Sequence, residues 1–257
     1  MTNLDSKVLI VTGALGGIGK ATAHLLAASG ANVVASDIGG ADGAELATAL
    51  AKSGAEASYF PADLADEDQV RALVEHAVGH FGRLDGAFNN AGVPQRGEPL
   101  VNLTSKEFEK VWRVNVLGVF HCLKHQMTAM SEGGSIVNTS SGMGVMALAN
   151  AADYIASKHA VCGLTRAAAV EGAPVGIRVN AILPGLVRTP MVESLFAVDE
   201  PEFLAGVRNL HLIPRLAEAD EIGQAVRWLL SDEASFVTGA MIPVEGGTTA
   251  GRPITSG

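Results

Sequence analysis

The chain has 257 residues, 48% of them hydrophobic, which is enough for one large α/β domain with a sizeable core. Its 18 Lys and Arg residues against 27 Asp and Glu residues give a formal net charge of −9. Because no basic run interrupts this acidic balance, the composition argues against nucleic acid or an anionic membrane as a partner.

The cysteine content and the N-terminus bear on the compartment. Cys122 and Cys162 are far apart and form no Cys-x-x-Cys pattern. Such a pair is typical of buried thiols in a reducing compartment and not of a disulfide framework. The first apolar run is too short for a signal peptide, and no segment approaches the ~18 apolar residues of a membrane helix. We therefore expect a cytoplasmic protein.

Short β-branched runs alternate with longer Ala- and Leu-rich segments along the chain. The runs at 7–12, 31–36, 83–88, 134–140 and 177–183 are largely apolar, as in parallel strands that are covered on both faces. Segments 19–30 and 66–82 have helical composition, and the second has an acidic first turn and ends at Gly82. This alternation predicts an α/β fold of the Rossmann type, a doubly wound parallel sheet, in a single domain over 1–257.

One segment departs from this rhythm. Between 188 and 214 the alternation of strands and helices loosens, although apolar residues remain frequent. Insertions of this length in a compact domain are often lids or binding loops. We expect this segment to be a substrate loop.

A glycine cluster, TGALGGIG at 12–19, follows the first strand and opens the first helix. Glycines let a backbone approach a pyrophosphate, and the helix N-terminus supplies N–H groups, although any tight turn can use glycines. Asp37 ends the second strand, where a carboxylate can accept hydrogen bonds from both adenosine ribose hydroxyls or simply cap a turn. It would repel a 2′-phosphate, and neither Gly16 nor Ile38 offers a basic group. The pattern favours NAD over NADP.

Tyr154 and Lys158 lie four residues apart in DYIASK and would share one helix face. Such a pair can be packing alone. A free phenol has a pKa of ~10, and lowering it by about three units requires roughly 4 kcal/mol of preferential phenolate stabilisation. A nearby ammonium group, joined by an oxidised nicotinamide, can supply a shift of that size. Tyr154 would then act as an acid or base near neutral pH.

Several motifs occur together in a fixed order. They are T-G-x-x-x-G-x-G at 12–19, NNAG at 89–92, Asn115, Ser141, Y-x-x-x-K at 154–158 and PGLVRTP at 184–190. In this combination the chain resembles the short-chain dehydrogenase/reductase family over nearly its whole length.

The resemblance implies an NAD site made of four groups of residues. Gly13, Gly17, Ile18 and Gly19 would line the pyrophosphate. Asp63 and Leu64, at the expected end of the third strand, would contact the adenine. Asn90, Ala91 and Gly92 would pass beside the adenosine ribose. Pro184, Gly185, Val187 and Thr189 would hold the nicotinamide, with Thr189 bonding its carboxamide.

The resemblance also implies a catalytic tetrad of Asn115, Ser141, Tyr154 and Lys158. Ser141 is chosen over Ser140 because the family's serine precedes its tyrosine by 13 positions. Ser141 would orient the substrate oxygen, Lys158 would also bond the nicotinamide ribose, and Asn115 would hold a water that passes the proton to solvent. The resemblance further implies a homotetramer, with contacts through the last strand and the two helices that contain Asn115 and Tyr154.

No metal site is expected, because the histidines near Cys122 lack a convincing set of ligands. The segment from 191 to 212 is rich in apolar side chains, and Met143, Val145 and Leu148 would face the same space. This favours an oxidoreductase that transfers a hydride between NAD(H) and a neutral, largely apolar secondary alcohol or ketone, cyclic ones included. Two alternatives stay open: a nucleotide-sugar epimerase-like enzyme and a catalytically silent NAD-binding sensor or scaffold. The apolar residues of the segment from 191 to 212 are Leu195, Phe196, Val198, Phe203, Leu204, Val207 and Leu210.

Overall fold

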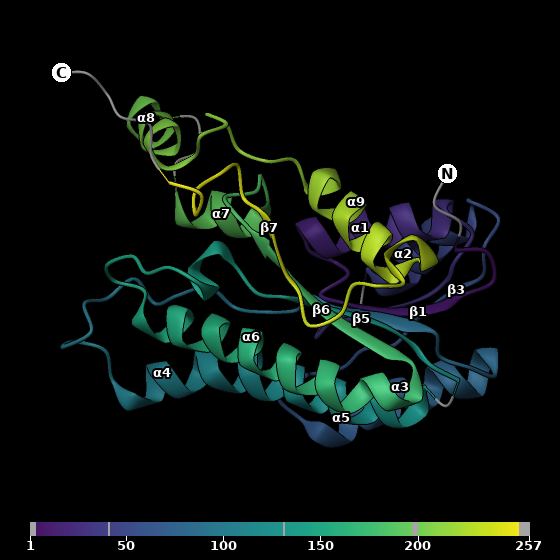
Figure 1. Cartoon of the computed structure of the whole chain (residues 1–257). Coiled ribbons are helices and arrows are strands. Elements are labelled where there is room, and N and C mark those ends of the chain that lie inside the picture. Colours follow the sequence, from purple (N-terminus) through teal and green to yellow (C-terminus); the bar gives the residue numbers. More distant parts are fainter. Residues whose placement is uncertain (1–3, 41, 131, 197–199, 252–257) are drawn as a thin grey trace.

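The computed structural model describes residues 4–40, 42–130, 132–196 and 200–251, except for the side chain of Leu195. Within them, one parallel sheet has the strand order β3-β2-β1-β4-β5-β6-β7 (Figure 1). The strands are β1 (Val8–Thr12), β2 (Asn32–Ser36), β3 (Ala57–Tyr59), β4 (Gly86–Asn89), β5 (Gly134–Thr139), β6 (Ile177–Pro184) and β7 (Met241–Val244).

Helices cover both faces of the sheet, which gives three layers (Figure 1). On one face lie α1 (Gly17–Ala28), α2 (Gly43–Ala51) and α9 (Ala219–Leu230). On the other lie α3 (Glu67–Phe81), α4 (Ser105–Trp112), α5 (Gly118–Ala129) and α6 (Ala152–Gly172). The helices α7 (Pro190–Leu195) and α8 (Pro201–Leu210) project beyond one edge of these layers.

The side chains of β1 alternate between two hydrophobic cores, one on each face of the sheet. All five residues of this strand are buried. Leu9 and Val11 pack in the core that includes Leu26 of α1, whereas Ile10 packs in the core that includes Leu73 of α3. Because successive side chains of a strand point to opposite faces, a central strand needs an unbroken apolar run to bury both. This confirms the predicted doubly wound parallel fold.

The strand order of the sheet changes direction between β1 and β4, and this change positions a binding site. From β1 the chain proceeds outward to β2 and β3, then returns to β4 on the other side of β1. The connections therefore diverge between β1 and β4, and a crevice opens beyond their carboxyl ends. Thr12 ends β1 and Asn89 ends β4, so the glycine cluster and the NNAG motif meet at this crevice.

The predicted helix ends at 66–82 are confirmed. The Asp66 side chain accepts hydrogen bonds from the backbone N–H groups of Asp68 and Gln69 and caps α3. Gly82 follows the helix with φ 79°, in the left-handed region where glycine is favoured.

Two local predictions need correction. The third strand was expected to end at Asp63 and Leu64, but β3 ends at Tyr59. Two further backbone hydrogen bonds to the β2 side follow it, from Phe60 N to Ala35 O and from Ala62 N to Asp37 O, each at 3.0 Å. Asp63 and Leu64 lie in the loop that follows. The helix expected around Asn115 is interrupted by a π-helical turn at Arg113–Leu117, between α4 and α5.

Candidate active site

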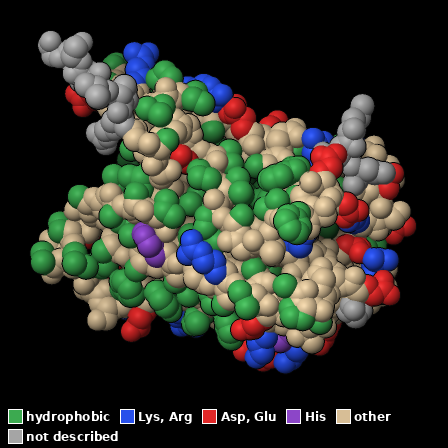
Figure 2. All heavy atoms as spheres, in the orientation of Figure 1, with side chains coloured by type: hydrophobic (Ala, Val, Ile, Leu, Met, Phe, Trp, Pro, Cys, Tyr) green, Lys and Arg blue, Asp and Glu red, His purple; other side chains and the backbone are tan. Residues whose placement is uncertain are grey.

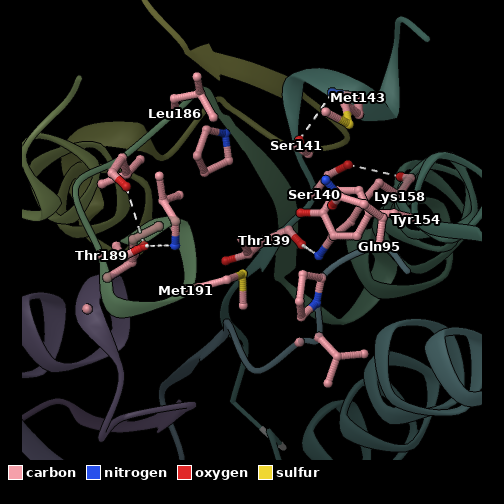
Figure 3. A pocket seen from close by; sticks show the side chains of 18 of the residues that line it. Gln95, Thr139, Ser140, Ser141, Met143, Tyr154, Lys158, Leu186, Thr189 and Met191 are labelled. Carbon is pink, nitrogen blue, oxygen red and sulfur yellow. Dashed lines mark hydrogen bonds between the residues drawn. The ribbon is translucent and has the colours of Figure 1, made fainter. Parts of the chain in front are cut away.

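A cavity of about 850 Å³ lies at the carboxyl ends of the strands. It extends from the glycine cluster that begins at Gly13, past Tyr154 and Lys158, to the helices α7 and α8. Figure 3 shows side chains from these separate segments around the opening, with Thr139, Ser141, Tyr154 and Lys158 on one side and Thr189 and Met191 on the other. The sequence-predicted residues from both ends of the site therefore share one continuous space.

The glycine cluster is close-packed and leaves the first turn of α1 facing the cavity. Gly13 has φ 66°, and a Cβ there would stand 2.9 Å from the Cα of Ala91. A Cβ on Gly17 would stand 2.5 Å from Cγ2 of Thr189. No side chain caps the N-terminus of α1, where Gly17 and Ile18 line the cavity. This part of the site has the geometry of an anion cradle with a positive helix end.

Asp37 lies at the same end of the cavity, one residue beyond β2. Its Oδ2 accepts a hydrogen bond from Leu15 N at 3.0 Å, and its Oδ1 accepts one from Ile38 N at 2.8 Å. The hydroxyl of Tyr59 donates to the carbonyl oxygens of Asp37 and Gly39. The carboxylate is therefore fixed in orientation, and each oxygen keeps further acceptor capacity.

The expected adenine and ribose residues also line the cavity, and hydrogen bonds fix their backbones. Asp63 Oδ1 accepts from Ala65 N at 2.9 Å, and the carbonyl of Leu64 lies 2.9 Å from Nδ1 of His121. The backbone N–H of Asn90 donates to Oγ1 of Thr12 at 3.0 Å. The residues of these groups that line the cavity are Asp63, Leu64, Asn90, Ala91 and Gly92.

Lys158, Tyr154 and Ser141 come together at the middle of the cavity. Lys158 Nζ lies 5.3 Å from the centroid of the Tyr154 ring and donates to the carbonyl oxygen of Thr139 at 3.0 Å. Ser141 Oγ accepts from Met143 N at 3.1 Å, and its hydroxyl is close enough to Tyr154 to lower the pKa of the phenol. Ser140 is buried, and its hydroxyl donates to the carbonyl oxygen of Lys158 at 2.9 Å, so it ties β5 to α6.

The pKa of Tyr154 is shifted in the direction opposite to the one expected from the sequence. Burial raises the pKa of Tyr154 to about 12, and the hydrogen bond from Ser141 only partly offsets the effect. Burial lowers the pKa of Lys158 to about 8. Both shifts favour the neutral form of each side chain. In the protein without a ligand, desolvation therefore outweighs the stabilisation of the Tyr154 phenolate by the Lys158 ammonium group that the sequence predicted. A lower Tyr154 pKa therefore requires positive charge brought by a bound molecule.

Asn115 is buried in the π-helical turn and connects three segments. Its Oδ1 accepts from Val93 N at 2.8 Å, and its Nδ2 donates to Val93 O at 3.0 Å and to Ser157 Oγ at 3.2 Å. Both amide hydrogens are thus used within the protein, one to hold the loop after β4 and the other to bond α6. The expected role of Asn115 in holding a water stays a prediction.

The segment expected to hold a nicotinamide forms another wall of the cavity, with Pro184, Gly185, Val187 and Thr189 all among its lining residues. Thr189 Oγ1 accepts from Val192 N at 3.4 Å and caps α7, and it donates to Val187 O at 3.3 Å. His211 Nε2 accepts from Leu186 N at 3.4 Å, and its Nδ1 lies 2.9 Å from Arg215 O. His211 is buried and links the end of α8 to this wall.

The expected apolar wall is present in part. Phe196 and Phe203 stack with ring centroids 5.1 Å apart, and both line the cavity with Val207 and Leu210. Leu204 is exposed and does not line it. Val198 and the side chain of Leu195 lie outside the described residues.

Other expectations for the substrate end had mixed outcomes. Met143 and Leu148 line the cavity, whereas Val145 does not. Sequence reasoning missed Gln95 and Met146, which also line it. They lie in irregular segments between elements, where no periodicity marks the side that a residue faces.

Among the described residues, no group of three or more His, Cys, Asp or Glu side chains is arranged to hold a metal ion. Within the same residues, every helix falls short of the length and apolar character that a membrane crossing requires.

Comparison with known proteins places the chain among dehydrogenases and reductases. A family model described as enoyl-(acyl carrier protein) reductase matches residues 13–249. The 2,5-dichloro-2,5-cyclohexadiene-1,4-diol dehydrogenase of Sphingobium indicum is 48% identical over 97% of this chain and 100% of that protein. Cyclohexanol dehydrogenase of an Acinetobacter species is 40% identical over 96% of each chain. The crystal structure of carveol dehydrogenase from Mycobacterium avium in complex with NAD has a TM-score of 0.90 and 34% identity, and it covers 98% of this chain and 100% of that chain.

Proposed function

Because the chain belongs to the short-chain dehydrogenase/reductase family, we propose that it interconverts a neutral, cyclic secondary alcohol and its ketone with NAD(H). The observation that carries this proposal is the single cavity in which Ser141, Tyr154 and Lys158 lie between the glycine cluster and an apolar end. This arrangement suits a reaction in which a cofactor and an apolar molecule meet at one tyrosine.

The protein groups would handle the proton of this reaction. NAD, when bound, supplies the hydride acceptor. Ser141, whose hydroxyl is close enough to Tyr154 to lower its pKa, would hold the substrate oxygen beside the phenol. Tyr154 would take the alcohol proton during oxidation and return it during reduction. Lys158, whose Nζ lies 5.3 Å from the Tyr154 ring, would stabilise the phenolate and bond the nicotinamide ribose.

The proposed cofactor is NAD and not NADP. The Asp37 carboxylate is held at the cavity wall by the N–H groups of Leu15 and Ile38, so it cannot easily turn away from a 2′-phosphate. Among the described residues that line the cavity, the basic side chains are Lys158 and His211, and both lie away from this end. A 2′-phosphate would therefore meet a like charge without a compensating cation. Equal kcat/KM values for NAD and NADP would contradict this preference.

The proposed substrate is a largely apolar ring alcohol. Methionine and phenylalanine side chains dominate the end of the cavity near α7 and α8, with Met143 and Met191 on opposite sides (Figure 3). Methionine fills irregular space and adapts to rings of different substitution. Two relatives are named for ring alcohols, one a cyclohexadiene-1,4-diol and the other cyclohexanol. Because cellular NAD pools are mostly oxidised, the proposed physiological direction is alcohol oxidation.

We also propose that the whole chain acts as one catalytic domain in a cytoplasmic homotetramer, with 188–214 as the substrate loop. Figure 2 shows hydrophobic side chains along the face of α6 and β7. Val170 of α6 is exposed, and Phe236, shortly before β7, is fully exposed. Exposed apolar side chains of this size favour burial between subunits. Light scattering that gave the mass of a monomer would contradict the tetramer.

The test of the proposed reaction is NADH formation, measured with cyclohexanol and substituted cyclohexanols as substrates. The Tyr154→Phe variant is compared in the same assay and for NADH binding. Loss of turnover with retained NADH binding supports the proposal. Unchanged turnover in this variant would exclude the proposed role of Tyr154. A wild-type protein that binds NADH but oxidises none of these alcohols would favour the sensor alternative, and turnover of nucleotide sugars would favour the epimerase alternative.

A further inference from the structure

We propose that Gln95 selects substrates with a second neutral oxygen, a hydroxyl or a carbonyl, on the side of the ring away from the reacting carbon. This inference rests on the proposed function and specifies its substrate class. Gln95 lines the cavity, and Figure 3 includes it among the side chains around the opening.

The loop that carries Gln95 is held against the proposed catalytic groups at three points. A Cβ on Gly92 would stand 3.6 Å from Nζ of Lys158. Val93 exchanges two backbone hydrogen bonds with the Asn115 amide, at 2.8 Å and 3.0 Å. The backbone N–H of Arg96 donates to Oδ2 of Asp153 at 3.0 Å.

The third of these contacts places the loop next to Tyr154 in particular. Asp153 is buried, precedes Tyr154 directly, and accepts the backbone N–H of Tyr154 on its other oxygen at 2.8 Å. One carboxylate therefore connects the start of α6 to the residue that follows Gln95. Because residues on both sides of Gln95 are fixed, its own position relative to the reacting centre is restricted.

The Gln95 carboxamide differs from the other polar side chains at this end of the cavity. It is half-buried, and it makes no hydrogen bond within the described part of the chain. Asn150, which lies just before α6, also lines the cavity and makes no hydrogen bond within the described part of the chain, but it is exposed to solvent. Other polar groups near α6, α7 and α8 have protein partners. These are Ser140, Ser141, Thr189, His211 and Thr248. Gln95 is thus a half-buried amide with free donors and a free acceptor for a ligand.

An amide in apolar surroundings selects for a polar partner. Met143, Met146, Leu148 and Phe196 line the same cavity as Gln95, so a wholly apolar ring that displaced water from the amide would not replace its hydrogen bonds. A carboxamide both donates and accepts, which matches a hydroxyl or a carbonyl oxygen. In a 1,4-disubstituted ring the two oxygens lie at opposite ends. When one oxygen meets Ser141 and Tyr154, the other faces the cavity wall.

The experiment compares two alcohols of similar shape in the intact enzyme with NAD. The first is cyclohexane-1,4-diol, and the second is 4-methylcyclohexanol, in which a methyl group replaces the second hydroxyl. The kcat/KM ratio of diol to methyl compound is measured for the wild type and for Gln95→Met, which keeps the length of the side chain but removes the amide. We expect the wild type to favour the diol and the variant to lower the ratio by about tenfold, as for one hydrogen bond to a neutral group.

Two controls separate this effect from general damage. NADH binding to Gln95→Met should match the wild type, because the amide is assigned to the substrate. Met191→Leu, a change in the apolar lining, should alter kcat/KM for both alcohols by a similar factor. An equal ratio in wild type and Gln95→Met, with both alcohols oxidised, would overturn the inference alone. If the wild type oxidised neither alcohol, the proposed function would fail and the inference with it.

Discussion

Replacing Lys158 with methionine should change the stability of the cofactor-free protein in a pH-dependent way. Lys158 is 4% exposed, and burial lowers its pKa from 10.5 to about 8. This difference of about 2.5 units corresponds to about 3 kcal/mol lost from the free energy of unfolding when the ammonium form is buried. Methionine removes that cost. It also removes the hydrogen bond to Thr139 O, which costs about 1–3 kcal/mol.

The sign of the pH dependence follows from the direction of the shift. Because the folded state holds the Lys158 proton less tightly than the unfolded state, the loss of stability is complete below about pH 8 and disappears as the pH rises towards 10.5. The hydrogen-bond loss in the variant depends less on pH. The stability of Lys158→Met relative to wild type should therefore fall by about 2 kcal/mol between pH 7 and pH 9.5.

Urea unfolding of both proteins without cofactor, at pH 7 and at pH 9.5, measures this difference. Lys52→Met, at an exposed lysine, is the matched control for the change of residue type. A stability difference between wild type and Lys158→Met that is the same at the two pH values would refute burial as the cause of the lowered Lys158 pKa.

Three further predictions concern the proposed reaction. Tyr154→Phe should lower kcat by about 10²–10⁴-fold while NADH binding, followed by fluorescence, stays unchanged; an active variant would exclude Tyr154 as the acid or base. Asp37→Ser should lower the ratio of kcat/KM for NAD to that for NADP by at least about tenfold, because the like charge is removed; an unchanged ratio would assign the preference elsewhere. Gly17→Ala should raise KM for NAD and lower Tm. Its Cβ would stand 2.5 Å from Cγ2 of Thr189, and the overlap costs about 1–3 kcal/mol. Wild-type values of KM and Tm would mean that Thr189 shifts without cost to make room for the methyl group.

Several features of the site are local and could be predicted from the sequence. The apolar run of β1 specifies a strand buried on both faces, and the acidic start and terminal Gly82 of α3 specify its ends. The four-residue spacing of Tyr154 and Lys158 specifies a shared helix face, and the glycine cluster specifies a close approach of backbone. In each case the sequence pattern that carries the prediction lies within a short stretch of the chain.

Other features depend on segments that meet only in the folded chain. The loop with Gln95 has no periodicity. Its position depends on Asn115 in the π-helical turn and on Asp153 in α6. β3 ends at Tyr59, before the Asp63 and Leu64 at which the family resemblance placed its end.

The sequence by itself determined the parallel sheet, the glycine cluster at the end of β1 and the pairing of Tyr154 with Lys158. Only the tertiary structure decided the ionisation of that pair, because burial raises the pKa of Tyr154 and lowers that of Lys158. The physical reason is that backbone conformation responds to neighbouring residues, whereas desolvation depends on everything that packs around a group in three dimensions.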